Sequence, residues 1–339
     1  MNNSQLLDRL LDGHDLEEQQ AYDLMQQFAA GDLDPAFSGA LLAGLRAKGE
    51  TADEIRGFAR AMRELALHPE IPEGAPTVDT VGTGGDGSGS LNLSTGTGLL
   101  AAASGSRVVK HGNRSVSSKS GSADMLECLG MPLPLHEKEA VDCLQATNFT
   151  FLFAPAYHPA MKAVVPVRAA LGVRTVFNIL GPLTNPASTP YQLIGAFSRD
   201  MAKLMAEALA GLPIERAFVV PGEPGWDEAT PAGDFWLYDV TPGSVVETQR
   251  SPEDYGLDRC APEDLAGGDA EHNARELERV LSGADKGAHR DALLMGTSLV
   301  LEVQGVASDA REGVALAAAA IDDGRAANFL ATLRAHFKN

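Results

Sequence analysis

Short β-rich runs alternate with helical stretches from Thr77 onward, and this alternation constrains the fold more than any other feature of the sequence. The runs are TVDTV, SRVVK, FTFLFAP, YQLIGAF, RAFVVPG and FWLYDV. Helical patterns between them include Ala123–Leu129, Met161–Leu171 and Arg199–Leu212. Such alternation predicts an α/β fold in which a mostly parallel central sheet is flanked by helices on both faces.

The first 70 residues contain helical patterns only. Leucines recur at helical spacing between Leu6 and Leu11, and Thr51 with Glu54 forms a capping box before another apolar stripe. HPEIPEGAP, with three prolines in nine residues, is typical of a linker. We therefore expect a small all-helical domain at 1–70 and a large α/β domain at 76–339. The interrupted helical segment at about 163–185 is expected to join the small domain.

Charge and composition exclude several classes of partner. The formal net charge is −19 over 339 residues, so the surface repels nucleic acid and anionic membranes. The three cysteines are far apart and form no CxxC pair, which fits a reducing cytoplasm. The N-terminus lacks the pattern of a signal peptide, and no apolar run approaches the ~20 residues that span a bilayer. We expect a cytoplasmic protein.

The glycine-rich stretch VGTGGDGSGSLNLSTGTG lies between the run TVDTV and an apolar helix. Its glycines allow sharp bends and a close approach of backbone N–H groups to a ligand, and a following helix N-terminus favours phosphate. Although it contains G-x-G-x-x-G, no helix opens there and no acidic residue follows at the ribose-binding distance. No G-K-[ST] follows either, which excludes a P-loop. The stretch predicts a different kind of phosphate loop; the alternative is a flexible surface loop.

A second polar stretch, KHGNRSVSSKSGSAD at 110–124, leaves the C-terminal end of the run SRVVK. That end of a strand borders the usual ligand crevice of an open α/β sheet. Lys110 supplies a point charge for phosphate, and the serines supply neutral donors. We expect Ser122 to cap the helix that follows. The alternative is a solvated basic loop, which a strongly acidic chain makes less favourable.

Asp227 and Glu228 follow the run RAFVVPG in a loop rich in glycine and proline. Adjacent carboxylates suit Mg²⁺, which is bound through one or two carboxylates together with substrate phosphates. Such a pair is more often plain solvated surface. Arg168, Arg174, His111 and His158 are open to the same structural interpretation when each is taken alone.

These motifs together resemble the anthranilate phosphoribosyltransferases over nearly the whole chain. The matching motifs, in the family's order, are GTGGDG, Asn92–Thr95, KHGNRSVSSKSGSAD, HPAMK, PVR, LG-R-T-FN-LGPLTNP, the Asp-Glu pair and GGDAEHNA. The resemblance implies a small helical domain plus a large α/β domain, a homodimer formed through the helical domain, and two Mg²⁺ ions. It also implies transfer of the phosphoribosyl group of phosphoribosyl pyrophosphate to the amine of anthranilate.

The resemblance also implies a set of site residues. Substrates would be bound by Gly82, Gly85, Asp86, Ser90, Asn92, Ser94, Thr95, Lys110, His111, Gly112, Asn113, Arg114, Ser117, Ser118, Ser122 and Arg168. The metal ligands would be Ser94, Asp227 and Glu228. No acid or base is implied, and Arg168, Asn113 and His111 would position the acceptor.

Several positions depart from the family pattern. Ser90 stands where threonine is common and keeps the hydroxyl, and Met295 stands where asparagine is frequent. Ala163 and Ala169 replace a frequent polar residue and a second arginine, which leaves the outer anthranilate entrance in question. The rival functions are a pyrimidine-nucleoside phosphorylase and a nucleic-acid-binding relative. The acidic pair and the KHGNR block disfavour the first, and the net charge disfavours the second.

Overall fold

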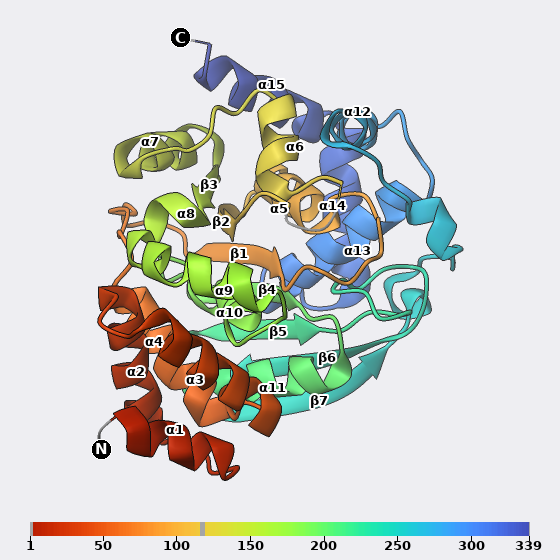
Figure 1. Cartoon of the computed structure of the whole chain (residues 1–339). Helices are drawn as coiled ribbons and strands as arrows, with labels where there is room; N and C mark the ends of the chain where they lie inside the picture. The colour runs from red at the N-terminus through yellow and green to blue at the C-terminus, as the bar shows by residue number, and fades with distance from the viewer. Residues whose placement is uncertain (1–2, 116–118, 339) are drawn as a thin grey trace.

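The computed structural model describes residues 3–115 and 119–338, so Ser117 and Ser118 lie outside the described residues. Helices cover both faces of a central sheet, and a bundle of N-terminal helices packs at one side (Figure 1). None of the described helices is both long and apolar enough to cross a membrane.

The sheet has the order β3-β2-β1-β4-β5-β6-β7 among the described residues. Its strands are β1 (Thr77–Gly82), β2 (Arg107–Gly112), β3 (Phe149–Phe153), β4 (Tyr191–Gly195), β5 (Arg216–Val220), β6 (Phe235–Thr241) and β7 (Ser244–Arg250). The first five pair in parallel, whereas β6 and β7 pair antiparallel. The prediction of a mostly parallel sheet flanked by helices is therefore confirmed.

Two hydrophobic clusters lie on opposite faces of this sheet. One cluster contains residues of α5 (Leu93–Ala103), α6 (Ser122–Cys128), α7 (Glu137–Thr147), α12 (Ala270–Leu281), α13 (Ala288–Val303), α14 (Ala310–Asp322) and α15 (Arg325–His336). The other contains residues of α11 (Arg199–Leu209) and of the N-terminal helices. The sheet is buried between these two layers. We therefore expect a ligand to bind at the carboxyl ends of its parallel strands.

The N-terminal helices are α1 (Asn3–Leu11), α2 (Glu18–Ala30), α3 (Pro35–Lys48) and α4 (Ala52–Glu64). The expected capping box starts α4, since the Thr51 side chain accepts from the Glu54 N–H and the Glu54 side chain accepts from the Thr51 N–H. Gly57 lets α4 lie directly against α2, because a Cβ there would be 2.2 Å from the Glu18 carbonyl oxygen. Tight helix packing in this bundle thus depends on a small residue at the contact.

The segment after β3 is broken into short pieces that pack on the bundle. They are α8 (Ala154–Tyr157), η1 (Pro159–Ala163), α9 (Val165–Leu171), α10 (Phe177–Leu180) and η2 (Gly181–Leu183). The helical pattern over Met161–Leu171 is divided between η1 and α9, as an interrupted segment predicts, and Pro166 lies in the first turn of α9, where its missing N–H costs no hydrogen bond. Nε of Arg63 on α4 donates to the Leu183 carbonyl at 2.7 Å, which joins this segment to the bundle.

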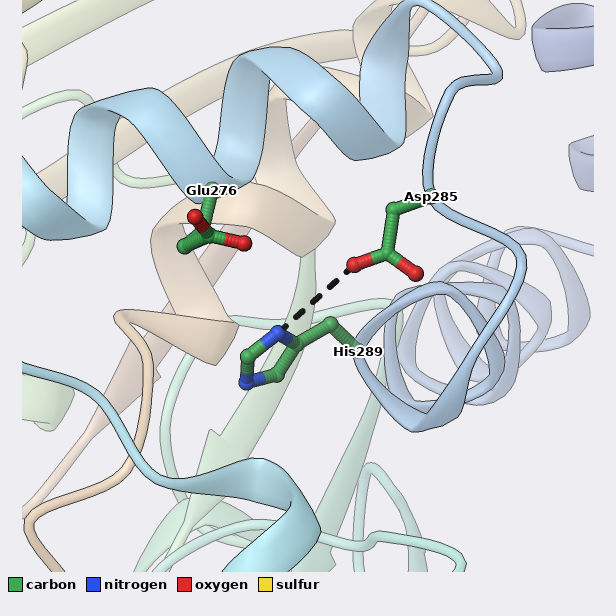
Figure 2. Close-up of side chains that lie close together, drawn as sticks. All are labelled: Glu276, Asp285 and His289. Carbon is green, nitrogen blue, oxygen red and sulfur yellow. Dashed lines mark ion pairs between the residues drawn. The ribbon is translucent and has the colours of Figure 1, made fainter.

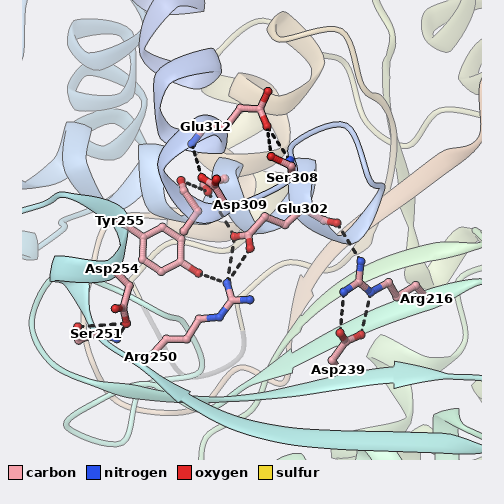
Figure 3. A network of polar contacts seen from close by, with 12 residues as sticks. Arg216, Asp239, Arg250, Ser251, Asp254, Tyr255, Glu302, Ser308, Asp309 and Glu312 are labelled. Carbon is pink, nitrogen blue, oxygen red and sulfur yellow. Dashed lines mark hydrogen bonds and ion pairs between the residues drawn. The ribbon is translucent and has the colours of Figure 1, made fainter.

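Figure 3 shows the polar network that ties the antiparallel edge of the sheet to α13. Arg250 on β7 donates to the Glu302 carboxylate at 2.8 Å and to the Tyr255 hydroxyl at 2.8 Å. Arg216 on β5 pairs with Asp239 on β6 at 2.6 Å. Because Glu302 is largely buried, loss of Arg250 would leave an unpaired carboxylate against the core.

Candidate functional site

The glycine loop runs from the end of β1 to the start of α5, at the carboxyl edge of the parallel strands. Gly84, Gly85, Gly87 and Gly89 all have positive φ, between 62° and 74°, which other residues adopt only with strain. Gly82 leaves room for the acidic loop, because a Cβ there would lie 2.3 Å from Asp227 Oδ2. The loop is therefore shaped by its glycines and held against the acidic pair.

Asp227 and Glu228, in the loop between β5 and β6, point towards the glycine loop; Asp227 is buried and Glu228 is half-buried. The Gly84 N–H donates to Asp227 Oδ2 at 2.5 Å, and the Ser94 N–H donates to Glu228 Oε1 at 2.9 Å. Burial, with the nearby charge of Asp86, raises the pKa of Asp227 to about 7, and burial raises the pKa of Glu228 well above its usual range. The interpretation of this pair as solvated surface is wrong.

A cavity of about 30 Å³, roughly the room for one water molecule, adjoins the acidic pair. Its lining includes Ser94 and Thr80 on one side and both carboxylates on the other. Two carboxylates beside a hydroxyl form an oxygen-rich donor set, which is the chemistry that a hard divalent cation requires. The three predicted metal ligands are thus brought together.

Lys110 lies at the end of β2 and is 1% exposed. Its Nζ donates to the Thr80 carbonyl oxygen and to Ser94 Oγ, the latter at 3.3 Å. Burial lowers the pKa of its ammonium group, and the charges of Asp79, Glu228 and Asp227 oppose that shift. The structure thus puts a buried cation next to the acidic pair.

Asp79, in the middle of β1, is a site residue that the sequence reasoning missed. It accepts hydrogen bonds from the His111 N–H at 3.1 Å and from Asn185 Nδ2 at 2.8 Å. Burial raises its pKa to about 6, although Lys110 and Asn185 favour the charged form. An aspartate in the middle of the β-rich run TVDTV was the available signal.

His111 and His158 lie together beneath the segment that ends at η2. Their ring centroids are 5.1 Å apart, and His111 Nδ1 contacts the Gly181 carbonyl oxygen at 3.2 Å. Burial lowers the pKa of His111 to about 3 and that of His158 to about 4. Both imidazoles are therefore neutral at pH 7, and neither is available as a general acid there.

The glycine loop and the second polar loop are joined by side chains at the start of α5. Thr95 Oγ1 donates to Ser122 Oγ at 3.0 Å, and Asn92 Nδ2 donates to the Ser120 carbonyl at 3.1 Å. Ser122 is not the helix cap we expected: Gly121 occupies that position, and Asp124 Oδ2 accepts from its N–H at 2.9 Å. The Ser122 hydroxyl instead faces the other loop.

Other predicted residues of these loops have local partners in the structure. Asp86 Oδ1 accepts from Ser88, whose hydroxyl contacts the hydroxyl of Ser90 at 3.1 Å. Arg114 pairs with Asp124 at 2.8 Å and with Glu127 at 2.6 Å, so its guanidinium faces carboxylates in this structure.

Three further predicted positions lie at the turn after β2 and on the mid-chain segment. Gly112 ends β2 where a Cβ would come within 2.9 Å of Phe151, and the Asn113 side chain accepts from the Arg114 N–H. The Arg168 guanidinium lies 5.2 Å from the Phe177 ring centroid, and burial lowers its pKa. Arg168 thus lies on the segment that packs on the small bundle, with its side chain against Phe177.

Figure 2 shows a second group of possible metal ligands, the only one of three or more His, Cys, Asp or Glu side chains found within the described residues. His289 Nδ1 lies 3.9 Å from Asp285, and Glu276 lies alongside. Glu276 also pairs with Arg279 at 3.2 Å, and Asp285 accepts from the Gly287 N–H at 2.7 Å. Local contacts account for both carboxylates, so we assign no ion here.

Comparison with known proteins gives the same result over both parts of the chain. Residues 74–327 match the glycosyl transferase family α/β domain, and residues 4–66 match the helical bundle domain of that family. The chain is 46% identical to the anthranilate phosphoribosyltransferase of Rubrobacter xylanophilus, over 93% of this chain and 91% of that protein. It is also 46% identical to that of Azorhizobium caulinodans, over 95% of this chain and 92% of that protein.

Solved structures agree. The anthranilate phosphoribosyltransferase of Thermus thermophilus superimposes with a TM-score of 0.91 at 41% identity, covering 98% of this chain and 99% of its own. The Saccharomyces cerevisiae enzyme in complex with PRPP and Mg superimposes with a TM-score of 0.89 at 27% identity, covering 99% of this chain and 98% of its own. The chain belongs to the anthranilate phosphoribosyltransferase family.

The departures from the pattern of the anthranilate phosphoribosyltransferases fall at distinct places. Met295 on α13 is fully buried in the core and takes no part in the loops. Ala163 and Ala169 are exposed on η1 and α9. Arg174 reaches the glycine loop, where it donates to the Gly85 carbonyl oxygen. It therefore links the mid-chain segment to the glycine loop, a contact that no local pattern predicts.

Proposed function

We propose that this chain transfers the phosphoribosyl group of phosphoribosyl pyrophosphate to the amine of anthranilate, releasing pyrophosphate, the second step of tryptophan biosynthesis from chorismate. The observation that carries the proposal is the buried acidic pair held against a glycine loop and a buried lysine, in a chain of this family. That arrangement suits a complex of a diphosphate with a divalent cation.

Asp227, Glu228 and Ser94 are the residues we propose to hold Mg²⁺, in two ions. A bound divalent cation neutralises charge on the diphosphate leaving group. The protein's own contribution is to bring two carboxylates and a hydroxyl to one place at the end of the sheet. The yeast relative has been solved in complex with PRPP and Mg, which supports this assignment.

The diphosphate sugar would be bound by the two loops. Lys110 supplies a positive charge, and the glycine loop from Gly82 to Ser90 supplies backbone N–H donors. Asn92, Thr95 and Ser122 lie where the loops meet. Charge on the departing pyrophosphate is thereby stabilised without any proton transfer from the protein.

Anthranilate would lie towards His111, Asn113 and Arg168. The amine of an aniline is neutral at pH 7, so the nucleophile needs positioning rather than a strong base. His111 is itself neutral because of burial, and Arg168 can pair with the acceptor's carboxylate. The relative from yeast in complex with 4-fluoroanthranilate supports an aromatic acceptor.

Organisation beyond the site belongs to the same proposal. The small domain comprises residues 1–70 and about 163–185, and the large domain comprises residues 76–339. Two copies associate through the helical domain, and the enzyme works in the cytoplasm without nucleic-acid or membrane partners. The packing of α9 on α3 and the Arg63–Leu183 hydrogen bond support the first of these assignments.

The reaction is tested by incubating the purified chain with two substrate pairs, each with Mg²⁺. One pair is anthranilate and phosphoribosyl pyrophosphate, and the other is a pyrimidine nucleoside and inorganic phosphate. Mass spectrometry should find phosphoribosyl anthranilate from the first pair and no free base from the second. Phosphorolysis without transfer to anthranilate would establish the rival function.

A further inference from the structure

The motif GGDAEHNA, at residues 267–274, has no role in the reaction described so far. It connects η4 (Pro262–Leu265) to α12, more than 170 residues beyond the glycine loop in the chain. In the fold it lies directly against the end of that loop. The Gly267 N–H donates to the Gly89 carbonyl at 2.8 Å, and the Leu91 N–H donates to the Leu265 carbonyl at 3.0 Å. Ser90 and Ala266 form an antiparallel bridge between these contacts.

Gly267 is needed for this close approach. A Cβ at this position would lie 2.5 Å from the Ser90 carbonyl oxygen and 2.8 Å from the Leu91 nitrogen, both rigid backbone atoms. The backbone of the motif therefore forms one wall of the loop that we assign to the diphosphate sugar, and any side chain at Gly267 would push Ser90 out of place.

Asn273, on the first turn of α12, is 1% exposed and uses both ends of its amide. Its Oδ1 accepts from the Gly268 N–H at 2.7 Å, and its Nδ2 donates to Asn92 Oδ1 at 2.8 Å. Because a backbone N–H can only donate, the first contact fixes which end of the Asn273 amide is oxygen. The second contact then fixes the orientation of Asn92.

Asn92 joins the two substrate loops through the same amide. Its Oδ1 also accepts from Ser120 Oγ at 2.9 Å, and its Nδ2 donates to the Ser120 carbonyl at 3.1 Å. Both lone pairs of the oxygen and one N–H are therefore used by protein atoms. The second N–H of Asn92 has no acceptor among the hydrogen bonds of the described residues, which leaves it for a ligand.

We propose that Asn273 is a positioning residue for the diphosphate sugar. It orients the Asn92 amide, and through Asn92 it sets the distance between the glycine loop and the second polar loop at 110–124. The inference rests on the proposed function, since it concerns the binding of that substrate. Asn273 itself lies behind Asn92 and needs no contact with the ligand.

The sharpest variant is Asn273→Asp, which keeps the shape and the acceptor for Gly268 but replaces the donor by an oxygen. Two oxygens would then face each other at the Asn92 contact, and the Asn92 amide would have to turn over, placing its oxygen against the Ser120 carbonyl. We expect the dissociation constant for phosphoribosyl pyrophosphate with Mg²⁺ to rise at least about tenfold by calorimetry, the effect of losing one or two hydrogen bonds. The KM for anthranilate should change less than about twofold.

Arg275→Gln is the matched control. It makes the same change in net charge on the same helix, but Arg275 is exposed and makes only a 3.8 Å pair with Glu271. Its dissociation constant should equal that of the wild type. An unchanged constant in Asn273→Asp, or an equal rise in the control, would overturn the proposal.

A double-mutant cycle separates positioning from general support of the fold. If Asn273 acts through Asn92, then Asn273→Ala should weaken the binding of phosphoribosyl pyrophosphate when it is made in the wild type. The same substitution should have little further effect on that binding when it is made in Asn92→Ala. Additive losses would mean that Asn273 only stabilises α12, and would refute the inference. Failure of the proposed function would be distinct, because the wild-type protein would then not bind phosphoribosyl pyrophosphate at all.

Discussion

Lys110 is a single buried charge at the place where we propose that the diphosphate sugar binds. Its ammonium group lies between the Thr80 carbonyl, the Ser94 hydroxyl and the charge of Asp79, and it has almost no contact with solvent. A cation kept out of water at the end of a strand is costly unless it meets an anion. The neighbouring carboxylates provide part of that charge, and a diphosphate would provide more.

Lys110→Met should therefore weaken the binding of phosphoribosyl pyrophosphate roughly 10- to 150-fold, as expected for the loss of a charge-assisted contact of ~1.5–3 kcal/mol. Methionine keeps the apolar stem, so the fold should survive, which circular dichroism checks. Titration of the substrate into both proteins measures the change. An unchanged dissociation constant would show that Lys110 neutralises the acidic pair without contacting substrate.

We propose that Arg168 distinguishes an acceptor that has a carboxylate from one that lacks it. Its guanidinium lies over the Phe177 ring, and burial, which lowers its pKa, indicates that water is partly excluded around it. Arg168→Ala should raise the KM for anthranilate at least about tenfold, the effect of losing ~1.4 kcal/mol, while the KM for phosphoribosyl pyrophosphate changes much less.

Steady-state kinetics with each substrate varied in turn measure both constants. Arg168→Lys is the matched variant, since it keeps the charge but loses the planar fork, and it should fall between the wild type and the alanine variant. An equal rise in both constants would instead mean that Arg168 holds the mid-chain segment in place.

At the scale of elements, most strands and the helices between them could be predicted from the sequence. The segments that connect them could not. The apolar runs that became β1 to β6 are short, β-rich and bounded by glycine or proline. β7 was missed because its run, SVVETQR, is polar and exposed, and it is a strand only because it pairs with β6 across a tight turn. The hydrophobic pattern of a sequence reflects which side chains are buried, and few side chains of this edge strand are buried.

The residues of the candidate site also divide into those that the sequence predicted and those that it did not. Glycine loops and the acidic pair could be recognised because their composition is unusual. The hydrogen bonds of Asp79, Arg174 and Asn273 could not be predicted, because each joins residues 32 to 181 positions apart and depends on how the layers pack. Arg114 is a different case: its assignment to substrate stays a prediction, and its ion pairs with Asp124 and Glu127 could not be predicted from pattern.

The buried histidines under the mid-chain segment predict how that segment responds to acid. The pKa of His158 is lowered to about 4, below the ~6.5 of an unfolded chain, so the unfolded state binds more protons between these values. The stability that this group contributes is complete above pH 6.5 and is lost as the pH falls towards 4. At pH 5 the loss should be about 2 kcal/mol.

Urea unfolding of the wild type and His158→Gln at pH 8 and pH 5 measures this contribution. The difference at pH 8 reports packing alone, since the histidine is neutral in both states. The variant should lose about 2 kcal/mol less than the wild type between the two pH values. Parallel losses in the two proteins would show that His158 is accessible to protons in the folded state.

At the scale of the whole molecule, the site lies where three parts of the chain meet. The glycine loop comes from the centre of the sheet, the acidic pair from the loop between β5 and β6, and Arg174 from the segment packed on the N-terminal bundle. That segment and the bundle share a hydrophobic cluster with one face of the sheet. Substrate sites contributed by both domains are expected to respond to domain movement.

Metal-dependent turnover in the wild type and in the double variant Asp227→Asn, Glu228→Gln tests the central claim most directly. The rate of phosphoribosyl anthranilate formation is followed with excess Mg²⁺ and with a chelator, after the fold of both proteins has been checked. The wild type should turn over only with Mg²⁺, and the folded double variant should lose at least about 100-fold in rate, as expected when an electrostatic contribution of ~2.7 kcal/mol or more is removed. Full activity of the double variant with Mg²⁺, or wild-type activity that persists in the chelator, would contradict the account.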